Sequence, residues 1–364
     1  MKRKMMAALL AAALALGATA CGSQEEPQRQ EGLWYETTGI SPDAALFTLD
    51  GRDVKAERFF YWLAYTCDYI STYYKNAGGD VDWNETAGGQ SLQAYVMQTA
   101  LESTVLYETV EAMAETYGCE ITEQDKGAIS MEWDAMAEQY GGEEAYLAGI
   151  ARMGLDRAAA ERMAEDQYLY SHLYDLYCKE GSALYPTEDD LQDFTKAEDY
   201  LAADHILIST LDLPAEDSAG RQACRQRAED AAARLRSSAD PAGAFAQIAA
   251  ECSDEDREEY PAGYTFAPGD GVMPEDFVAA VRELKENEIS PVIELDSGYC
   301  IILRKPLDMD TVRMDYFDNL IQTAAKSAEI RYSADWEQLT VPDFYAKLLT
   351  ARSALSEDDA AASE

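Results

Sequence analysis

The chain has 364 residues, which is enough for two or three domains and for more than one hydrophobic core. It carries 29 Lys and Arg against 69 Asp and Glu, a formal net charge of −40, so a phosphate backbone is not expected as a partner. Because 47% of the residues are hydrophobic and 10% are aromatic, we expect a folded chain whose acidic residues lie on the surface.

The first residues have the pattern of an export signal. Basic residues at 2–4 precede an apolar run over 5–17, which is too short to span a bilayer. Small residues then lead into Cys21, a pattern that resembles the lipobox of bacterial lipoproteins. The resemblance implies a signal peptide over 1–20, a lipid anchor on Cys21, a tether over 21–33 and a location on the extracytoplasmic face of the bacterial cell membrane. The alternative is an ordinary secretory signal with an incidental cysteine.

The other cysteines form no recognisable metal or redox motif. They are widely spaced and include no CxxC pair, so they support neither a zinc site nor a dithiol centre. Several are expected to be small buried hydrophobes, although export would allow some to oxidise. We therefore expect no metal and no cofactor. These cysteines are Cys67, Cys119, Cys178, Cys224, Cys252 and Cys300.

Residues 34–198 are predicted to be mostly helical. A short strand over 46–49 enters a tight turn, and the apolar residues beyond it recur with the helical period. Thr122 and Asp125 have the spacing of a capping box at the start of one helix, and Gly118 is placed to end the helix before it. The main helices are expected over 59–70, 91–117, 122–140, 143–153 and 156–180.

The pattern changes at Leu201, where a different domain is expected to begin. The segment over 204–208 is short and rich in β-branched residues, as in a strand. A helix beginning near Met273 has an apolar stripe at i, i+3, i+4 and i+7. The remaining elements are predicted as helices over 221–236 and 242–252 and strands over 263–266, 292–295 and 299–303.

This region, about 199–307, resembles the parvulin-type peptidyl-prolyl isomerase domain. Three motifs in the expected order carry the resemblance: the His-Ile-Leu-Ile strand from His205, the Gly-x-Met-x-x-x-Phe helix entry over 271–277, and Glu-Ile-Ser-Pro-Val over 288–292 followed by Ser-Gly-Tyr-Cys-Ile-Ile over 297–302. The resemblance implies an α/β domain in which flanking helices pack on a four-stranded antiparallel sheet.

The flanking regions extend the resemblance to PrsA-type foldase lipoproteins. The helical region over 34–198 is similar to that of SurA-like periplasmic chaperones, and a helical return over 308–350 is expected to pack back on it. The fold class is therefore α+β, with a discontinuous, mostly helical chaperone domain and an inserted parvulin-like domain. The last residues, 351–364, are acidic and small and are predicted to be disordered.

By this resemblance, Phe266, Met273 and Phe277 would form a pocket for the substrate proline ring. Each of them could equally be plain core in a small domain. Rotation about an X-Pro amide needs no covalent step. A site accelerates it by binding the twisted amide more tightly than the planar one. The segment after the first strand, 210–217, is acidic and would repel a phosphate, so unphosphorylated X-Pro segments are the expected substrates.

The polar part of the site departs from the family. His205 matches the first family histidine, but Cys300 stands where the second is usual. The third polar position of the family falls at Asp254 or at Glu255, and the sequence leaves both open. A cysteine nucleophile with His205 as its base is a weaker alternative, because the sequence offers no oxyanion motif.

Two functions follow from these residues. The first is a membrane-anchored extracytoplasmic foldase, both peptidyl-prolyl isomerase and chaperone. The second is a holdase whose parvulin domain only binds. A solute-binding lipoprotein is disfavoured because no second α/β lobe is visible. The expected partners are unfolded or newly exported proteins with X-Pro segments and, through Cys21, the membrane; nucleic acid is not among them, and a homodimer stays open.

Overall fold

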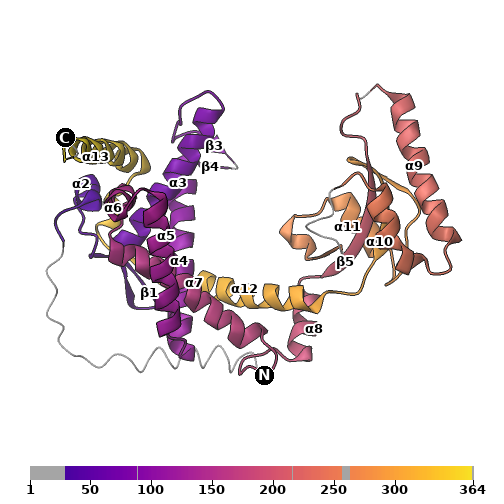
Figure 1. Ribbon diagram of the computed structural model, residues 1–364, viewed down its shortest axis with the longest axis horizontal. Helices are drawn as coiled ribbons and strands as arrows, with labels where there is room; N and C mark the ends of the chain where they lie inside the picture. Colours follow the sequence, from indigo (N-terminus) through magenta and orange to yellow (C-terminus); the bar gives the residue numbers. More distant parts are fainter. Residues whose placement is uncertain (1–28, 88, 215, 256–262, 363–364) are drawn as a thin grey trace. The chain divides into compact units, whose positions relative to one another are not determined.

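The computed structural model describes residues 29–87, 89–214, 216–255 and 263–362. Two compact units are distinguished, and each is described by itself (Figure 1). The helical unit is the chain up to Leu176 together with Asn319–Glu364, and the sheet unit is Tyr177–Asp318. The predicted signal peptide and the predicted lipid anchor, Cys21, lie outside the described residues.

The helical unit contains long helices and a small sheet. Its strands β1 and β2 form a hairpin, and β9, almost three hundred residues later, pairs antiparallel with β1 in the order β2-β1-β9. The helices are α2 (Leu33–Thr38), α3 (Ala56–Asn76), α4 (Leu92–Tyr117), α5 (Glu123–Gln139), α6 (Glu143–Ala151), α7 (Arg157–Cys178), which crosses into the sheet unit, and α13 (Val341–Ala362). The strands are β1 (Ala45–Leu49), β2 (Arg52–Lys55), β9 (Ile330–Tyr332) and the small hairpin β3 (Thr86–Ala87) and β4 (Gln90–Ser91).

Local signals in the sequence set several of these boundaries. Thr122 and Asp125 form the predicted capping box: the Thr122 side chain accepts from the Asp125 backbone N–H, and the Asp125 carboxylate accepts from the Thr122 backbone N–H. Gly118 ends α4 in the left-handed conformation, with φ of 70°, as its position predicted. Capping was therefore readable from the sequence in this part of the chain.

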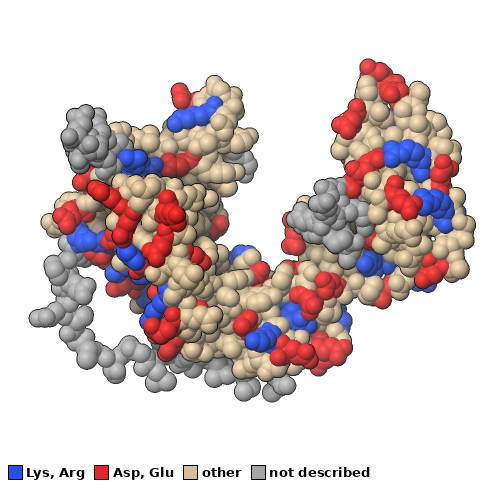
Figure 2. Space-filling view, viewed as in Figure 1, with Lys and Arg blue, Asp and Glu red and all other residues tan. Residues whose placement is uncertain are grey.

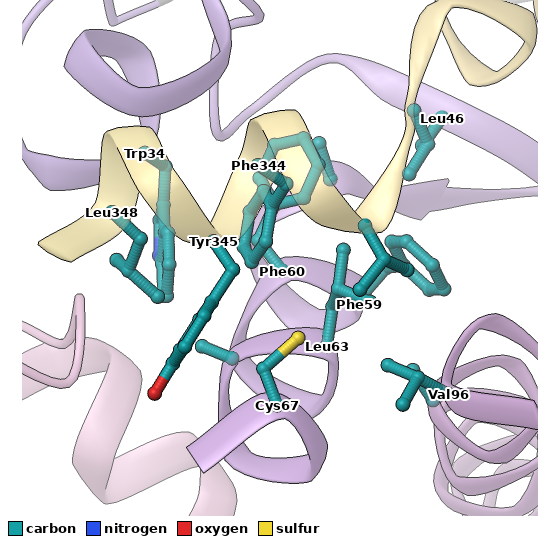
Figure 3. Packing of buried hydrophobic residues seen from close by; sticks show 14 of the residues in the cluster. Trp34, Leu46, Phe59, Phe60, Leu63, Cys67, Val96, Phe344, Tyr345 and Leu348 are labelled. Atoms are coloured by element: carbon teal, nitrogen blue, oxygen red, sulfur yellow. The ribbon is translucent and has the colours of Figure 1, made fainter. Parts of the chain in front are cut away.

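The core of the helical unit joins the two ends of the chain. Helix α3 supplies Phe59, Phe60 and Leu63, and α13 lays Phe344 and Leu348 over the same cluster (Figure 3). All five side chains are fully or almost fully buried. The C-terminal return therefore packs on the N-terminal helices.

Two details at the ends of the helical unit differ from the sequence prediction. The predicted tether over 21–33 is anchored from Arg29, whose guanidinium pairs with Asp43 at 2.9 Å and also with Glu57. The prediction of a disordered tail from residue 351 is wrong as far as Ala362, because α13 continues to that residue. Ala351 and Leu355 pack against the core, and this contact keeps the helix in place although its composition is acidic.

The sheet unit contains the predicted four-stranded antiparallel sheet. Its strand order is β6-β5-β8-β7, so the first and last long strands lie together at the centre. The strands are β5 (Leu201–Ser209), β6 (Tyr264–Phe266), β7 (Ile293–Leu295) and β8 (Gly298–Arg304). The helices are α8 (Glu188–Ala197), α9 (Ser218–Ser237), α10 (Pro241–Cys252), α11 (Glu275–Arg282) and the first part of α12 (Met309–Ser327).

Residues alternate between the two faces of this sheet. Ile206 and Ile208 on β5 and Ile301 on β8 face a core formed with α9 and α10. Ala203 and Ile302 face the other way, toward α11. We call this second side the site face.

The sheet unit is longer than the sheet and its covering helices. A separate small cluster joins Leu191 and Phe194 of α8 to Tyr200 and to Val312 of α12. This cluster extends the unit to Tyr177 and Asp318, beyond the 199–307 predicted for the parvulin-like domain. In neither unit is a helix of the described residues both long and apolar enough to cross a bilayer.

Candidate functional site

His205 is the centre of a polar network on the site face. Its Nε2 lies 2.7 Å from Oε2 of Glu255, and its side chain is only 9% exposed. The Tyr264 hydroxyl donates to the other Glu255 oxygen at 3.3 Å, and the Tyr264 ring stacks on the imidazole with centroids 5.8 Å apart. The Glu255 carboxylate therefore bridges an imidazole and a phenol, and each of these contacts restricts the orientation of the others.

The structure separates the two acidic candidates that the sequence left open. Asp254 accepts a hydrogen bond from the Ser209 backbone N–H at 3.0 Å and pairs with Arg227 at 2.6 Å. Its own backbone N–H donates to the Leu207 carbonyl. Asp254 thus ties the loop to the edge of β5, and it is Glu255 that reaches His205.

Cys300 lies on the site face but is not directly opposite His205. The register pairs Leu207 with Cys300 and His205 with Ile302, so His205 and Cys300 are diagonal neighbours on adjacent strands. The thiol is fully buried, and burial, with smaller contributions from the charges of Glu255 and Asp276, raises its pKa far above the ordinary value. Because the thiolate is the reactive form, this cysteine is not an activated nucleophile, and the acyl-transfer alternative loses its support.

The three predicted pocket residues do come together. Phe266 on β6, Phe277 on α11 and Met273 just before α11 belong to one apolar cluster on the site face. The rings of Phe266 and Phe277 are 6.3 Å apart, and Phe277 meets the His205 ring edge-on at 5.3 Å. The phenylalanines are 6% and 3% exposed, whereas Met273 is half-buried, so Met273 is the part of the cluster that a ligand reaches first.

The start of helix α11 combines residues that favour a helix N-terminus with a stripe of buried apolar residues. Pro274 occupies the N-cap, and Glu275 and Asp276 place negative charge in the first turn. Phe277, Val278 and Val281 then form the buried side of the helix, and this packing fixes the aromatic ring above the sheet.

Two residues near the site were not singled out in the sequence. Tyr264 lies two positions before Phe266 on the same strand, and this period-two spacing is a signal that could have placed it on the same face. Asp276 precedes Phe277 and is exposed, but its charge helps to raise the pKa of the Cys300 thiol.

Ser290, in one of the family motifs, accepts a hydrogen bond from the Ile302 backbone N–H at 2.9 Å and so holds the preceding loop against β8.

The other histidine of the chain, His172, is not part of this site. His172, in the helical unit, lies 3.3 Å from the Asp125 carboxylate, next to the capping box of α5. No group of three or more His, Cys, Asp or Glu among the described residues is arranged to hold a metal ion. The polar network and the apolar cluster of the site face therefore remain the candidate site.

One part of the chain matches a known protein family. Residues 205–305 match the family model described as "Rotamase: PPIC-type PPIASE domain". That segment begins at His205 and includes Glu255, Tyr264, the pocket residues and Cys300. No curated protein matches the chain.

Several solved structures are similar at low identity. PrsA from Bacillus subtilis is 15% identical, with 76% of this chain and 91% of that chain covered, at a TM-score of 0.27. Foldase protein PrsA from Streptococcus pneumoniae str. Canada MDR_19A is 15% identical, with coverages of 85% and 94% and a TM-score of 0.24. A SurA-like chaperone of Campylobacter jejuni is 15% identical, with coverages of 67% and 92% and a TM-score of 0.23. The family match supports the conclusion that residues 205–305 form a PPIC-type PPIase domain.

Proposed function

We propose that this chain is an extracytoplasmic foldase that isomerises X-Pro bonds of unfolded client proteins. The observation that carries the proposal is the meeting of the His205–Glu255–Tyr264 network and the Phe266–Phe277 cluster on one face of the sheet. The polar network lies beside the apolar cluster, so an X-Pro segment could place its amide against the first and its proline ring against the second.

The reaction needs no covalent intermediate. The planar X-Pro amide is held by resonance, and the barrier to rotation is about 18–20 kcal/mol. An apolar wall that includes Met273 and the edge of Phe277 would hold the pyrrolidine ring while the preceding carbonyl turns. The His205–Glu255 pair would keep a fixed polar environment beside the rotating amide, so that the twisted form is bound more tightly than the planar one.

The missing second family histidine does not remove this mechanism. Cys300 is buried and its thiol stays neutral, so it fills the strand position without adding a charge beneath the site. In this chain the carboxylate of Glu255, rather than a second imidazole, contacts the His205 ring at its Nε2. We therefore propose His205 and Glu255 as the polar site residues, with Cys300 and Asp254 as structural neighbours.

A holdase without catalysis is the second candidate, and a surface of the helical unit favours it. Tyr65, Tyr69 and Tyr73 recur every four residues along α3 and are 55%, 65% and 65% exposed. Side chains at this spacing share one face of a helix, so they form a continuous aromatic stripe. Such a stripe could hold apolar segments of an unfolded chain while the sheet unit only binds proline.

The location and the domain roles belong to the same proposal. A lipid on Cys21 would attach the protein to the extracytoplasmic face of the membrane, with 34–198 and 308–350 as the chaperone domain and 199–307 as the isomerase domain. Unphosphorylated X-Pro segments are the proposed substrates, because the segment after β5 carries exposed Asp212 and Glu216 and no basic side chain. Mass spectrometry of the protein extracted from a bacterial membrane would test the anchor, since a Cys21→Ser variant should lose the lipid mass and stay soluble.

Two assays on the same preparation separate the candidates. We expect His205→Ala to lower prolyl isomerisation of a tetrapeptide while suppression of client aggregation is kept. Replacing Tyr65, Tyr69 and Tyr73 by Ser should do the reverse. If neither the chain nor any variant accelerates isomerisation, and only the tyrosine variant changes aggregation, the isomerase proposal fails and the holdase remains.

A further inference from the structure

The charge of the site suggests which X-Pro segments it accepts, an inference that rests on the isomerase function proposed above. Glu255 is one-third exposed at its side chain, and its described partners are His205 and Tyr264. Asp276 is exposed at the start of α11, where its carboxylate accepts a hydrogen bond from the backbone N–H of Phe277 at 2.8 Å. The two carboxylates therefore come from different elements, a loop and a helix.

These two carboxylates act on the same place in the site. Their charges both raise the pKa of the Cys300 thiol, which lies on the strand beneath the apolar cluster. Asp276 is adjacent in sequence to Phe277, whose ring touches His205, and Glu255 touches His205 directly. A ligand lying across Met273 and Phe277 would thus lie near both carboxylates.

Among the described residues, no Lys or Arg pairs with either carboxylate. Arg227 is paired with Asp254 at the edge of β5, and Arg282, on α11, is paired with Asp199 at 2.5 Å. Neither Glu255 nor Asp276 forms an ion pair with a Lys or Arg in the described part of the chain. Acidic side chains are also spread over the visible face of both units (Figure 2).

We infer that the site selects X-Pro segments in which a Lys or Arg lies next to the proline, and that Asp276 is a specificity-determining residue. A basic side chain beside the proline would be attracted by both carboxylates, and an acidic one would be repelled by both. Attraction in one case and repulsion in the other should together separate basic from acidic peptides by about tenfold in kcat/KM.

The test uses the chain from Gly22 onward and tetrapeptides that differ only in the residue before or after proline, with Lys, Ala or Glu at that position. We expect Lys peptides to exceed Glu peptides by about tenfold in low salt, and the ratio to shrink in 1 M NaCl, where the Debye length is about 3 Å. Asp276→Asn should reduce the ratio to about threefold.

Glu275→Gln is the matched control, because it removes the same charge one residue away, in the same first turn of α11. Its ratio should stay near that of the unmodified chain. Equal turnover of Lys and Glu peptides, or a preference that Asp276→Asn and Glu275→Gln alter equally, overturns the inference while the isomerase function stands. Absence of turnover with every peptide overturns both together.

Discussion

A buried carboxylate in the helical unit makes the stability of that unit depend on pH. Asp166, on α7, is 3% exposed and lies 3.2 Å from the guanidinium of Arg58, on α3. The same guanidinium also contacts Glu111 at 2.5 Å and Glu108 at 3.2 Å. Three carboxylates therefore surround a single positive charge.

This arrangement favours the protonated form of Asp166. Burial raises its pKa to about 8; Arg58 opposes the rise, and Glu111 and Glu108 add to it. An unfolded Asp has a pKa of about 3.9, so folding takes up a proton between about pH 4 and pH 8. The contribution of Asp166 to stability is therefore fully present below about pH 4 and is lost as the pH rises to about 8.

The magnitude follows from proton linkage. When the folded state binds one proton more than the unfolded state, the free energy of unfolding falls by about 1.4 kcal/mol for each unit by which the pH rises. Between pH 5 and pH 7 the unmodified chain should lose about 3 kcal/mol relative to Asp166→Asn, which keeps the shape and can still donate a hydrogen bond but does not titrate. The other carboxylates titrate in both proteins, so the difference between them reports Asp166 and its coupled neighbours.

Tryptophan fluorescence during urea unfolding is the assay, because it observes the helical unit alone. All 5 tryptophans lie in that unit. They are Trp34, Trp62, Trp83, Trp133 and Trp336. Asp175→Asn, an exposed change on the same helix, serves as the control and should show the pH dependence of the unmodified chain.

The reasoning is refuted if Asp166→Asn and the unmodified chain lose the same stability between pH 5 and pH 7. It is also refuted if Asp166→Asn is the less stable protein at pH 7 by several kcal/mol. That result would mean that Asp166 is ionised in the folded state and that its pairing with Arg58 outweighs its burial.

Three further predictions concern single contacts. Gly154→Ala should destabilise the helical unit by more than about 3 kcal/mol, because a Cβ there would lie 2.0 Å from the buried Trp34 indole. Gly118 has a similar positive φ but nothing within 4 Å of the added Cβ, so Gly118→Ala should cost only about 1 kcal/mol in the same unfolding assay. Cys300 should resist iodoacetamide in the folded protein and react after denaturation, as measured by peptide mass spectrometry, and rapid labelling of the folded chain would contradict its burial. Tyr264→Phe should lower kcat/KM on a prolyl tetrapeptide about three- to tenfold without changing the melting temperature, since it removes the hydrogen bond to the Glu255 carboxylate. Unchanged turnover would exclude a role for this hydrogen bond in catalysis.

Local patterns in the sequence predicted the elements of the site better than its polar contacts. The short β-branched run of β5 and the helical stripe of α11 are local signals, whereas the four-stranded sheet and the cluster of Phe266, Met273 and Phe277 were predicted from the resemblance to parvulin-type domains. The choice between Asp254 and Glu255 could not be predicted, because adjacent residues in a loop point different ways and the loop geometry decides which reaches His205.

The exact pairings between distant parts of the chain could not be read from the sequence. The pairing of Ile330–Tyr332 with β1 joins segments almost three hundred residues apart, and no local pattern specifies that register. The same holds for Asp166, whose position on α7 looks like any polar helix residue until the packing of α3 and α4 puts Arg58, Glu108 and Glu111 beside it. The acidic tail was predicted to be disordered for a related reason. Its composition reflects the polar residues of the helix, but it does not show that Ala351 and Leu355 pack against the core of the unit.

The central claim is that the site face of the sheet unit catalyses X-Pro isomerisation although Cys300 replaces the second family histidine. The most direct test is kcat/KM on a tetrapeptide with Ala before proline, for the chain from Gly22 onward and for Met273→Ala, a change at the half-buried edge of the apolar cluster that should leave the fold intact. The account predicts turnover by the unmodified chain and a loss of about tenfold or more in Met273→Ala at an unchanged melting temperature. Absence of turnover in the unmodified chain, with turnover appearing in Cys300→His, would contradict it and would leave the sheet unit as a binding module.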